Sequence, residues 1–594
     1  MSSLKDLASL IMIPSLVKDG RLDTVKPLGN GIIHPDATGN NDGTDGSTPS
    51  EGNFTFSRGS NLAATRVDVN GLIEKGRENQ FLYSNVFNNV AWRTNGSASG
   101  GQIDRNGSTN AWIVSSVLGS ALIGYQTITL AGVHTFSIYV KINNSNGLGI
   151  GFGSLSNAAR FDISDATKTG AVTETGLISS SQEYVGNNFY HLSVTANMSG
   201  STQMRMYLTT ADGTASDAQG GAQIVQDAQL EQSLVATDYI ETGASTAQSG
   251  ILEDLPRLDY SGGASCPSLK LEPQRTNRVT DSEYLNGTWS ENRSTLIVND
   301  DTSPEGVNNA TKLQEDTTAS NTHFTGKGYS YVSGTTYSWS VYAKADGRDE
   351  IAIQQGNPSV VSFNAVFNFT SETAANFGNG TARIEDAGNG WYRCIIEGTT
   401  ALLSSGTNIN VFLRSGNSTT YTGDGTSGVL LYGFQLEAGS YPTSYIPTYG
   451  SAVTRSQDYV GVVDVSSLGV TTGYTVFYDL DTSTLDPTTW LIQRDASGDY
   501  LWQQYGNTAI LNTASGGVYP FNLVSGRNKA AIAFDGTNIT TFLNGIKVGT
   551  FVAASAWNTF GILNLNNNPT KVNWKQLLVF PTALTDSECI ALTS

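Results

Sequence analysis

The chain has 594 residues and a net charge of −19, and only 14 % of its residues are charged. An acidic chain without clusters of Lys and Arg offers no surface to a phosphate backbone, so nucleic acid is excluded as a partner. No apolar stretch reaches the roughly eighteen residues of a membrane span, and we expect no membrane insertion. The length suffices for about three to five domains, and 64 glycines favour short strands and turns over long helices.

The three cysteines, Cys266, Cys394 and Cys589, lie far apart and show no metal-ligand spacing. Such a sparse, odd set predicts free thiols in a chain that folds in a reducing cytoplasm. We expect no signal peptide, because the apolar run from Leu10 to Pro14 is too short for its core. A protein without an export signal can still reach the outside as part of a particle that lysis releases.

The N-terminal segment, residues 1–55, is expected to carry no core of its own. Residues 4–17 predict one or two turns of amphipathic helix that end at Pro14, and either a docking peptide or a frayed terminus fits this pattern. Residues 34–53 read as a flexible linker. The stretch from Asn40 to Ser47 resembles a calcium loop, but the closing Glu is missing. We therefore expect no cofactor, with structural calcium not supported by a clear motif.

An internal repeat follows. Glu74, Arg77 and Asn79 in the first copy have the spacing of Glu272, Arg275 and Asn277 in the second. The copies end in related strings that contain Glu231 and Glu437. Further matches join Trp92 with Trp289, residues 136–141 with 339–344, and residues 186–190 with 388–392. The offset stays between 198 and 206 residues, so the chain holds two copies of one domain.

Each copy predicts a β-sandwich. Apolar and polar residues alternate over 136–141, as in a strand with one buried face. About 170 residues with many short strands suit two packed sheets. The recurring aromatic positions are expected in the core: Trp92, Trp289, Trp339 and Trp391.

Arg and Asp recur together at the module junctions. The pairs are Arg66 with Asp68, Arg257 with Asp259, and Arg455 with Asp458. Charged hydrogen bonds between such residues would lock neighbouring modules together. We also expect Glu231 and Glu437 to form ion pairs with Arg77 and Arg275. A glycosidase pair of carboxylates stays open as an alternative, because such pairs converge only in space.

Residues 456–594 form a third unit that is not a further copy. Asp535-Gly536 and Asn544-Gly545 are hairpin turn signals between apolar strands. Thr585 and Glu588 predict a capping box on a short closing helix. The fold class is all-β, with tandem β-sandwich (jelly-roll) domains. The domain plan is a docking segment and linker (1–55), repeat 1 (56–247), a linker (248–276), repeat 2 (277–450) and the third unit (456–594).

The third unit resembles the laminin-G/concanavalin-A-like jelly roll, whose order of short motifs it keeps at 533–536, 543–545 and 578–581. The repeats resemble carbohydrate-binding-module-like sandwiches of bacteriophage tail and fibre proteins. The opening Glu-x-x-Arg-Thr-Asn at 272–277 and the ending Tyr-Ile-Pro-Thr at 445–448 carry this resemblance. Repeat 1 departs from it at Glu78 and Glu241. The segments 5–8, 18–22 and 54–59 are also similar to phage virion proteins.

One hairpin outside the repeat pattern is the candidate ligand site. Residues 495–505 place aromatic and acidic side chains around a turn: Asp495, Asp499, Tyr500, Trp502 and Tyr505. Sugars bind where an aromatic face stacks on the ring and short polar groups meet the hydroxyls. The alternative interpretation is that Trp502 is a core residue. The four histidines show no metal spacing.

The resemblance implies a non-enzymatic virion protein, in a fibre or appendage of the tail or the head, which docks to other virion proteins through its N-terminal segment. Its modules would bind host cell-surface glycans, and we expect a homo-oligomer, with a trimer as one arrangement. Two alternatives remain: a depolymerase that trims surface polysaccharide, and an architectural decoration protein without a ligand.

Overall fold

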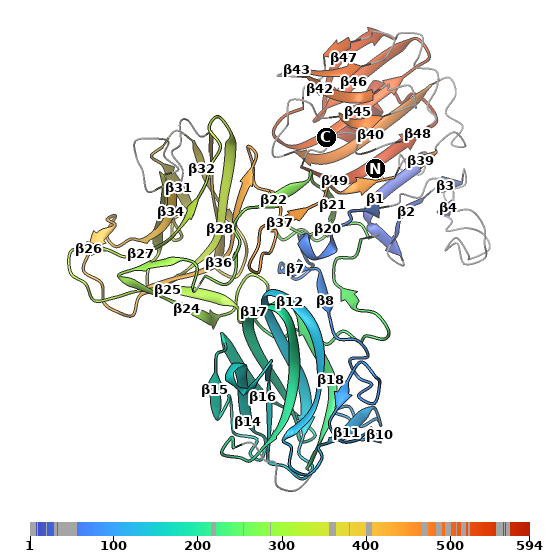
Figure 1. Ribbon diagram of the computed structural model, residues 1–594. Coiled ribbons are helices and arrows are strands. Elements are labelled where there is room, and N and C mark those ends of the chain that lie inside the picture. The colour runs from blue at the N-terminus through green and yellow to red at the C-terminus, as the bar shows by residue number, and fades with distance from the viewer. Residues whose placement is uncertain are drawn as a thin grey trace.

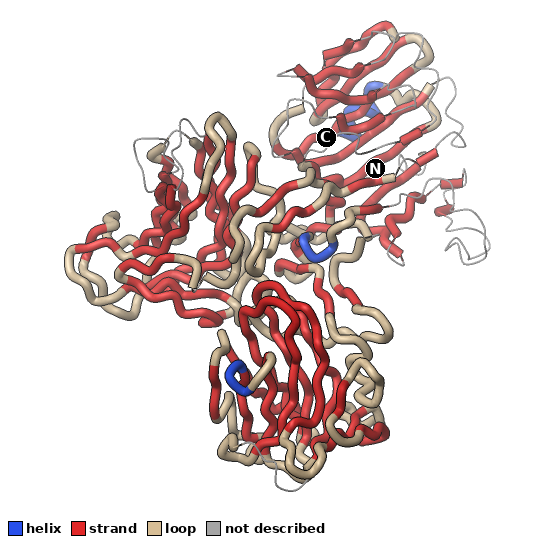
Figure 2. Tube along the Cα trace, in the orientation of Figure 1, coloured by secondary structure: helices blue, strands red, loops and turns tan. Residues whose placement is uncertain are grey.

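The computed structural model is an all-β chain of three lobes that meet at a common centre (Figure 1). From residue 56 onward it describes the chain apart from 215–220, 254, 286, 356–363, 379, 400–406, 462, 465–472, 483–489, 494–499, 506–507, 513–517, 521–522, 554–561, 564 and 566–570. Of the first 55 residues it describes 8, 10–18, 21–25, 27–28 and 32–33. The calcium-like stretch at 40–47 lies outside the described residues. Strands dominate, and helices are few and short (Figure 2).

Repeat 2 is a sandwich of two six-stranded antiparallel sheets. One sheet runs in the order β23 (Ser290–Asn292), β27 (Phe324–Tyr329), β34 (Thr407–Leu413), β29 (Glu350–Gln355), β30 (Asn364–Asn368) and β31 (Thr373–Asn376). The other runs β24 (Ser294–Asp301), β25 (Ala310–Glu315), β36 (Gly428–Ala438), β28 (Thr336–Asp346), β33 (Trp391–Thr399) and β32 (Thr381–Asp386).

Repeat 1 has the same strand order in its two layers, but two long strands, β12 (Leu122–Lys141) and β17 (Phe189–Thr209), run through both layers and join them into one ten-stranded sheet. Its first layer contains β9 (Arg93–Thr94), β12, β17, β13 (Gly147–Phe152), β14 (Ala158–Asp162) and β15 (Thr173–Thr175). Its second contains β10 (Ala98–Gln102), β11 (Ala111–Ser115), β18 (Ala222–Glu231), β12, β17 and β16 (Ser179–Gly186). The strand-by-strand match confirms the tandem β-sandwich prediction.

The cores of the two sandwiches are apolar and closed. Three of the recurring tryptophans, Trp92, Trp289 and Trp339, lie in them at 5 % exposure or less. The fourth, Trp391, is equally buried but packs on the outer face of repeat 2, against Ile73. The expected burial of these residues is therefore confirmed.

The third lobe is built on an antiparallel sheet of β40 (Tyr474–Thr482), β45 (Gly526–Phe534), β46 (Asn538–Leu543), β47 (Ile546–Val552) and β49 (Val572–Phe580). A second sheet contains β41 (Trp490–Gln493), β42 (Tyr500–Tyr505), β43 (Thr508–Asn512) and β44 (Val518–Pro520). The closing helix α2 (Asp586–Thr593) has the predicted capping box between Thr585 and Glu588.

The expected N-terminal helix is wrong. Residues 10–18 form strand β1 (Leu10–Lys18), which pairs with β49 and with β2 (Arg21–Val25). Met12 is fully buried in the core of the third lobe. An open strand edge offers unpaired backbone groups, and the β-branched Ile11, Ile13 and Val17 favour the extended form that satisfies them. The segment therefore has a core, which the third lobe supplies.

Short strands join the lobes at the centre of Figure 1. The stretch expected as a linker, 248–276, contains β20 (Leu258–Asp259) and β21 (Ser268–Leu271), and β21 pairs with β49. Other central pairs are β6 (Thr65–Val67) with β7 (Ile73–Lys75), β22 (Arg275–Asn277) with β37 (Val453–Arg455), β8 (Arg77–Asn79) with β19 (Ala247–Ser249), and β5 (Phe56–Ser57) with β38 (Tyr459–Val460).

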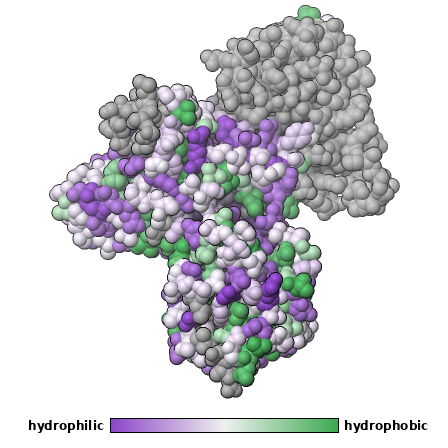
Figure 3. Space-filling view, viewed as in Figure 1, coloured by the Kyte–Doolittle hydropathy of each residue, from purple (hydrophilic) through white to green (hydrophobic). Residues whose placement is uncertain are grey.

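On the face that Figure 3 shows, hydrophobic residues on the two repeats form small groups between hydrophilic ones. No helix in the described part of the chain is long and apolar enough to span a membrane.

Candidate functional site

The repeat signature has a structural role that both copies share. Asn277 is fully buried, and its amide donates to the carbonyls of Phe434 and Ile446 at 3.0 and 2.8 Å. Its oxygen accepts from the backbone N–H groups of Val279 and Leu436. Asn79 makes the same four bonds in repeat 1, with Ala228, Ile240, Phe81 and Leu230. A buried amide needs these partners, which explains why this residue recurs.

The recurring glutamates do not bond to the recurring arginines as expected. Glu437 accepts from the side chain of Gln435 at 2.7 Å and from the backbone and hydroxyl of Thr443. Glu231 makes the same contacts with Gln229 and Thr237. Each carboxylate thus ties the loop after its strand to that strand.

The two arginines bond elsewhere. Arg77 donates to Glu305 of repeat 2 at 3.2 Å, and the guanidinium of Arg275 lies 5.3 Å from the ring centre of Tyr441.

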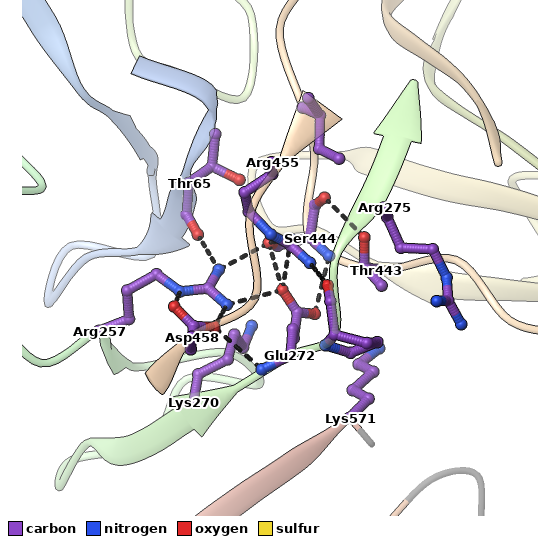
Figure 4. A network of polar contacts seen from close by, with 12 residues as sticks. Thr65, Arg257, Lys270, Glu272, Arg275, Thr443, Ser444, Arg455, Asp458 and Lys571 are labelled. Carbon is purple, nitrogen blue, oxygen red and sulfur yellow. Dashed lines mark hydrogen bonds and ion pairs between the residues drawn. The ribbon is translucent and has the colours of Figure 1, made fainter. Parts of the chain in front are cut away.

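A buried charged network lies where the lobes meet (Figure 4). Glu272, with a fully buried side chain, bonds to Arg257 at 2.9 Å and to Arg455 at 2.7 Å. It also accepts from the backbone and hydroxyl of Ser444. Burial alone would raise the pKa of Glu272, but Arg455 and Arg257 outweigh burial and hold this pKa well below its ordinary value. The carboxylate therefore stays charged and joins three segments of the chain.

Asp458 completes the network. It accepts from Arg58 at 3.0 Å and from Arg257, so segments 400 residues apart meet on one carboxylate. The predicted charged lock between junction arginines and aspartates is confirmed at Arg257 and Asp458. Arg66 instead pairs with Glu74 at 2.6 Å, with both side chains about a quarter exposed.

A second buried charge joins the repeats. The ammonium of Lys75, on β7, enters repeat 2 and donates to Glu283 at 3.0 Å, to Glu305 at 2.8 Å and to the hydroxyl of Tyr449 at 2.9 Å. The carboxylates are fully buried, and Lys75 is 5 % exposed along its side chain. Burial alone would lower the pKa of Lys75, but the two glutamates raise it well above its ordinary value.

Repeat 1 contains an open pocket with a different character. It has a volume of 410 Å³ and is lined by Asn85, Gly100, Gly101, Asp104, Asn106, Thr109, Asn110, Trp112, Gln226, Asp227, Tyr239 and Glu241. We call this set the repeat-1 pocket. Trp112 and Tyr239 are half-buried, and Asn106, Asn110 and Glu241 are exposed. Gly100 brings its backbone onto the indole of Trp112, since a Cβ there would lie 3.2 Å from the ring.

Strain marks one residue of this pocket. Asp227 has a φ of 53° at a bulge in β18, and the same bulge in repeat 2 carries Gly433 at a φ of 65°. The left-handed region is unfavourable for most non-glycine residues, and Asp and Asn adopt it more readily than the others. The Asp227 carboxylate accepts from Arg105 at 3.2 Å and from Gln226 at 2.8 Å. Such a backbone conformation persists only where the surrounding structure fixes it, and residues held in this way cluster at binding and active sites.

The lining fits a saccharide. Short amides and carboxylates offer several donors and acceptors for hydroxyls, and the aromatic rings of Trp112 and Tyr239 offer apolar surface. Two further pockets, of 440 and 550 Å³, lie between modules. In the first, Tyr449 is half-buried and its hydroxyl accepts from Lys75; in the second, Tyr342 and Tyr445 are buried in module contacts. The repeat-1 pocket is therefore the candidate functional site.

The hairpin predicted from the sequence lies on the third lobe. Tyr500, Trp502 and Tyr505 belong to β42, which pairs with β41 and β43. Asp495 and Asp499 lie outside the described residues, and of the three aromatic residues only the strand is described. The stacking platform stays a prediction.

Sequence reasoning missed the repeat-1 pocket, although one signal was present. Trp112 pairs with Val225 where repeat 2 pairs Thr311 with Leu431, so this tryptophan departs from the repeat. Over the described residues, no three His, Cys, Asp or Glu side chains are grouped to hold a metal ion. Cys266, Cys394 and Cys589 are free thiols, as expected.

No protein-family model and no curated protein matches the chain. Among solved structures, the tandem CBM22-1–CBM22-2 domain of Xyn10C from Paenibacillus barcinonensis aligns with 61 % of this chain and 97 % of its own, at 13 % identity and a TM-score of 0.20. A mutant of the NanB sialidase from Streptococcus pneumoniae aligns with 23 % of this chain and 27 % of its own, at 15 % identity and a TM-score of 0.18. At these scores neither likeness enters the argument on function.

Proposed function

We propose that this protein is a non-enzymatic carbohydrate-binding protein and that the repeat-1 pocket holds the saccharide. The observation that carries this proposal is the departure of repeat 1 from repeat 2 at this place. Trp112 and Asp227 replace Thr311 and Gly433, which adds an aromatic ring and a carboxylate to a surface pocket.

The setting we propose is a phage virion, in which the modules attach the particle to host-surface glycans. The motifs at 272–277 and 445–448 support it. Several copies on one particle, as in a homo-oligomer, would strengthen weak single contacts through effective concentration. The domain division at 56–247, 277–450 and 456–594 is part of this proposal, with the amendment that β1 and β21 complete the sheet of the third unit.

The test exchanges residues between the repeats. Trp112→Thr and Asp227→Gly place the repeat 2 residue at the matching position of repeat 1. On a glycan array followed by calorimetry with the best glycan, we expect each variant to bind at least about tenfold more weakly, a difference of 1.4 kcal/mol. Thr311→Ala, at the matching position of repeat 2, is the control. Unchanged binding in both repeat 1 variants would refute the proposal.

A further inference from the structure

The repeat-1 pocket lies at the same place in repeat 1 as the site in repeat 2 where Lys75 meets Glu283 and Glu305. Ser84 bonds to the hydroxyl of Tyr239 at 2.6 Å, and Ser282 bonds to that of Tyr445 at 2.6 Å. The turn closed by Asp104 and Ser108 matches the turn closed by Ser303 and Val307. These anchors align Asn85 with Glu283, Asn106 with Glu305, Asn110 with Asn309, and Gln226 with Tyr432.

In repeat 2 the matching place is filled by another part of the same chain. The β6–β7 hairpin lies on it: the N–H of Ile73 donates to the carbonyl of Pro304, and Ile73 packs against Tyr342, Trp391 and Tyr432. The ammonium of Lys75 then ends between Glu283 and Glu305. Two carboxylates in a buried site select a cation, because an unpaired charge there would be costly.

In repeat 1 asparagines stand at the positions of Glu283 and Glu305. The β20–β21 hairpin, which precedes repeat 2, pairs with β49 instead of entering the repeat-1 pocket. Asn85 accepts from the N–H of Asp227 at 3.1 Å and donates to the carbonyl of Asn110 at 3.2 Å. This leaves one N–H of its amide to donate. Arg105, at the position of Pro304, lies over the ring of Tyr139 at 4.2 Å and pairs with Asp227.

Resting on the proposed function, we infer that Asn85 and Asn106 set the specificity of the repeat-1 pocket for uncharged saccharides. An amide both donates and accepts, as a hydroxyl or an acetamido group requires, and it holds no ammonium. Three carboxylates line the pocket: Asp104, Asp227 and Glu241. Arg105 pairs with Asp227, so the charge around the pocket remains negative and disfavours acidic sugars. Among the differences between the pocket and its counterpart, the exchanges at Asn85 and Asn106 place an amide where repeat 2 has a carboxylate.

The experiment reverses these exchanges in the full chain. The Asn85→Glu/Asn106→Glu double variant and the Asn106→Glu single variant are compared with wild type on an array of neutral, acidic and amino-sugar glycans. N-acetylglucosamine and glucosamine tetramers serve as soluble probes that differ in charge. Asn197→Glu adds a carboxylate on an exposed position of β17 and is the control. Melting temperatures confirm that each variant is folded.

We expect wild type to select neutral glycans. The double variant should lose at least about tenfold in affinity for them and gain binding to amino-sugar glycans, and the single variant should shift in the same direction. Selection of acidic or amino sugars by wild type, or variants that keep neutral binding without any gain for amino sugars, would overturn the inference. The proposed function fails separately, if Trp112→Thr and Asp227→Gly both leave glycan binding unchanged.

Discussion

Replacement of Lys75 by methionine should expose the cost of the buried charge that joins the repeats. Methionine has a similar length and no charge, so Glu283 and Glu305 would remain buried without their shared ammonium. Removing one partner of a buried ion pair typically costs about 3–5 kcal/mol. We expect a loss of this size at pH 7.5, measured as the shift in the urea unfolding transition of the chain.

The loss should depend on pH, with a sign that the glutamates determine. Burial already raises the pKa of Glu283 with Lys75 in place, whereas Lys75 and Arg77 outweigh burial at Glu305 and lower its pKa. Without Lys75, both folded-state pKa values should lie above the unfolded value of about 4.3. A raised folded pKa stabilises the protein below the unfolded pKa, and this contribution is lost as the pH rises through the folded pKa. The deficit of the variant should therefore be smallest near pH 4.5 and grow towards pH 8.

The matched control is Lys344→Met. Lys344 pairs with Asp301 at 3.4 Å, and the two side chains are 31 % and 45 % exposed. An exposed pair of this kind is worth about 0–1 kcal/mol. Equal losses in the two variants, or a Lys75→Met deficit that does not change with pH, would refute the buried-pair reasoning.

Glu272→Ala leaves Arg257 and Arg455 buried without their shared carboxylate, so the urea transition should shift by about 3–5 kcal/mol. Glu74→Ala, at the matching position of repeat 1, removes a partly exposed pair and should cost less than about 1 kcal/mol; equal shifts would contradict the network. Deletion of residues 1–33 removes β1 and the buried Met12, and loss of such a core side chain lowers the free energy of unfolding by about 2–5 kcal/mol. Amide exchange in β49 should then accelerate while that in the repeats stays unchanged, and unaltered exchange in β49 would show that β1 is dispensable.

The sequence alone determined the repeat and the fold class. Period-two alternation, turn signals and matched spacing are local properties, so they predicted the sandwiches, the capping box at Thr585 and the burial of the recurring tryptophans. The junction arginines were also identified from their recurrence. The bonding partners of these arginines depend on which segments meet in the fold. Arg257 bonds to Asp458, which lies 201 residues further along the chain.

Only the tertiary structure decided the rest. Residues 10–18 carry apolar spacing that a helix and a strand can both use, and the open edge of β49 selects the strand. Asn85 and Asn106 are ordinary polar residues in the sequence, and their place opposite Glu283 and Glu305 depends on the superposition of two folded copies. The repeat-1 pocket gathers side chains from 85 to 241, and convergence of that kind is set by packing, which no local pattern records.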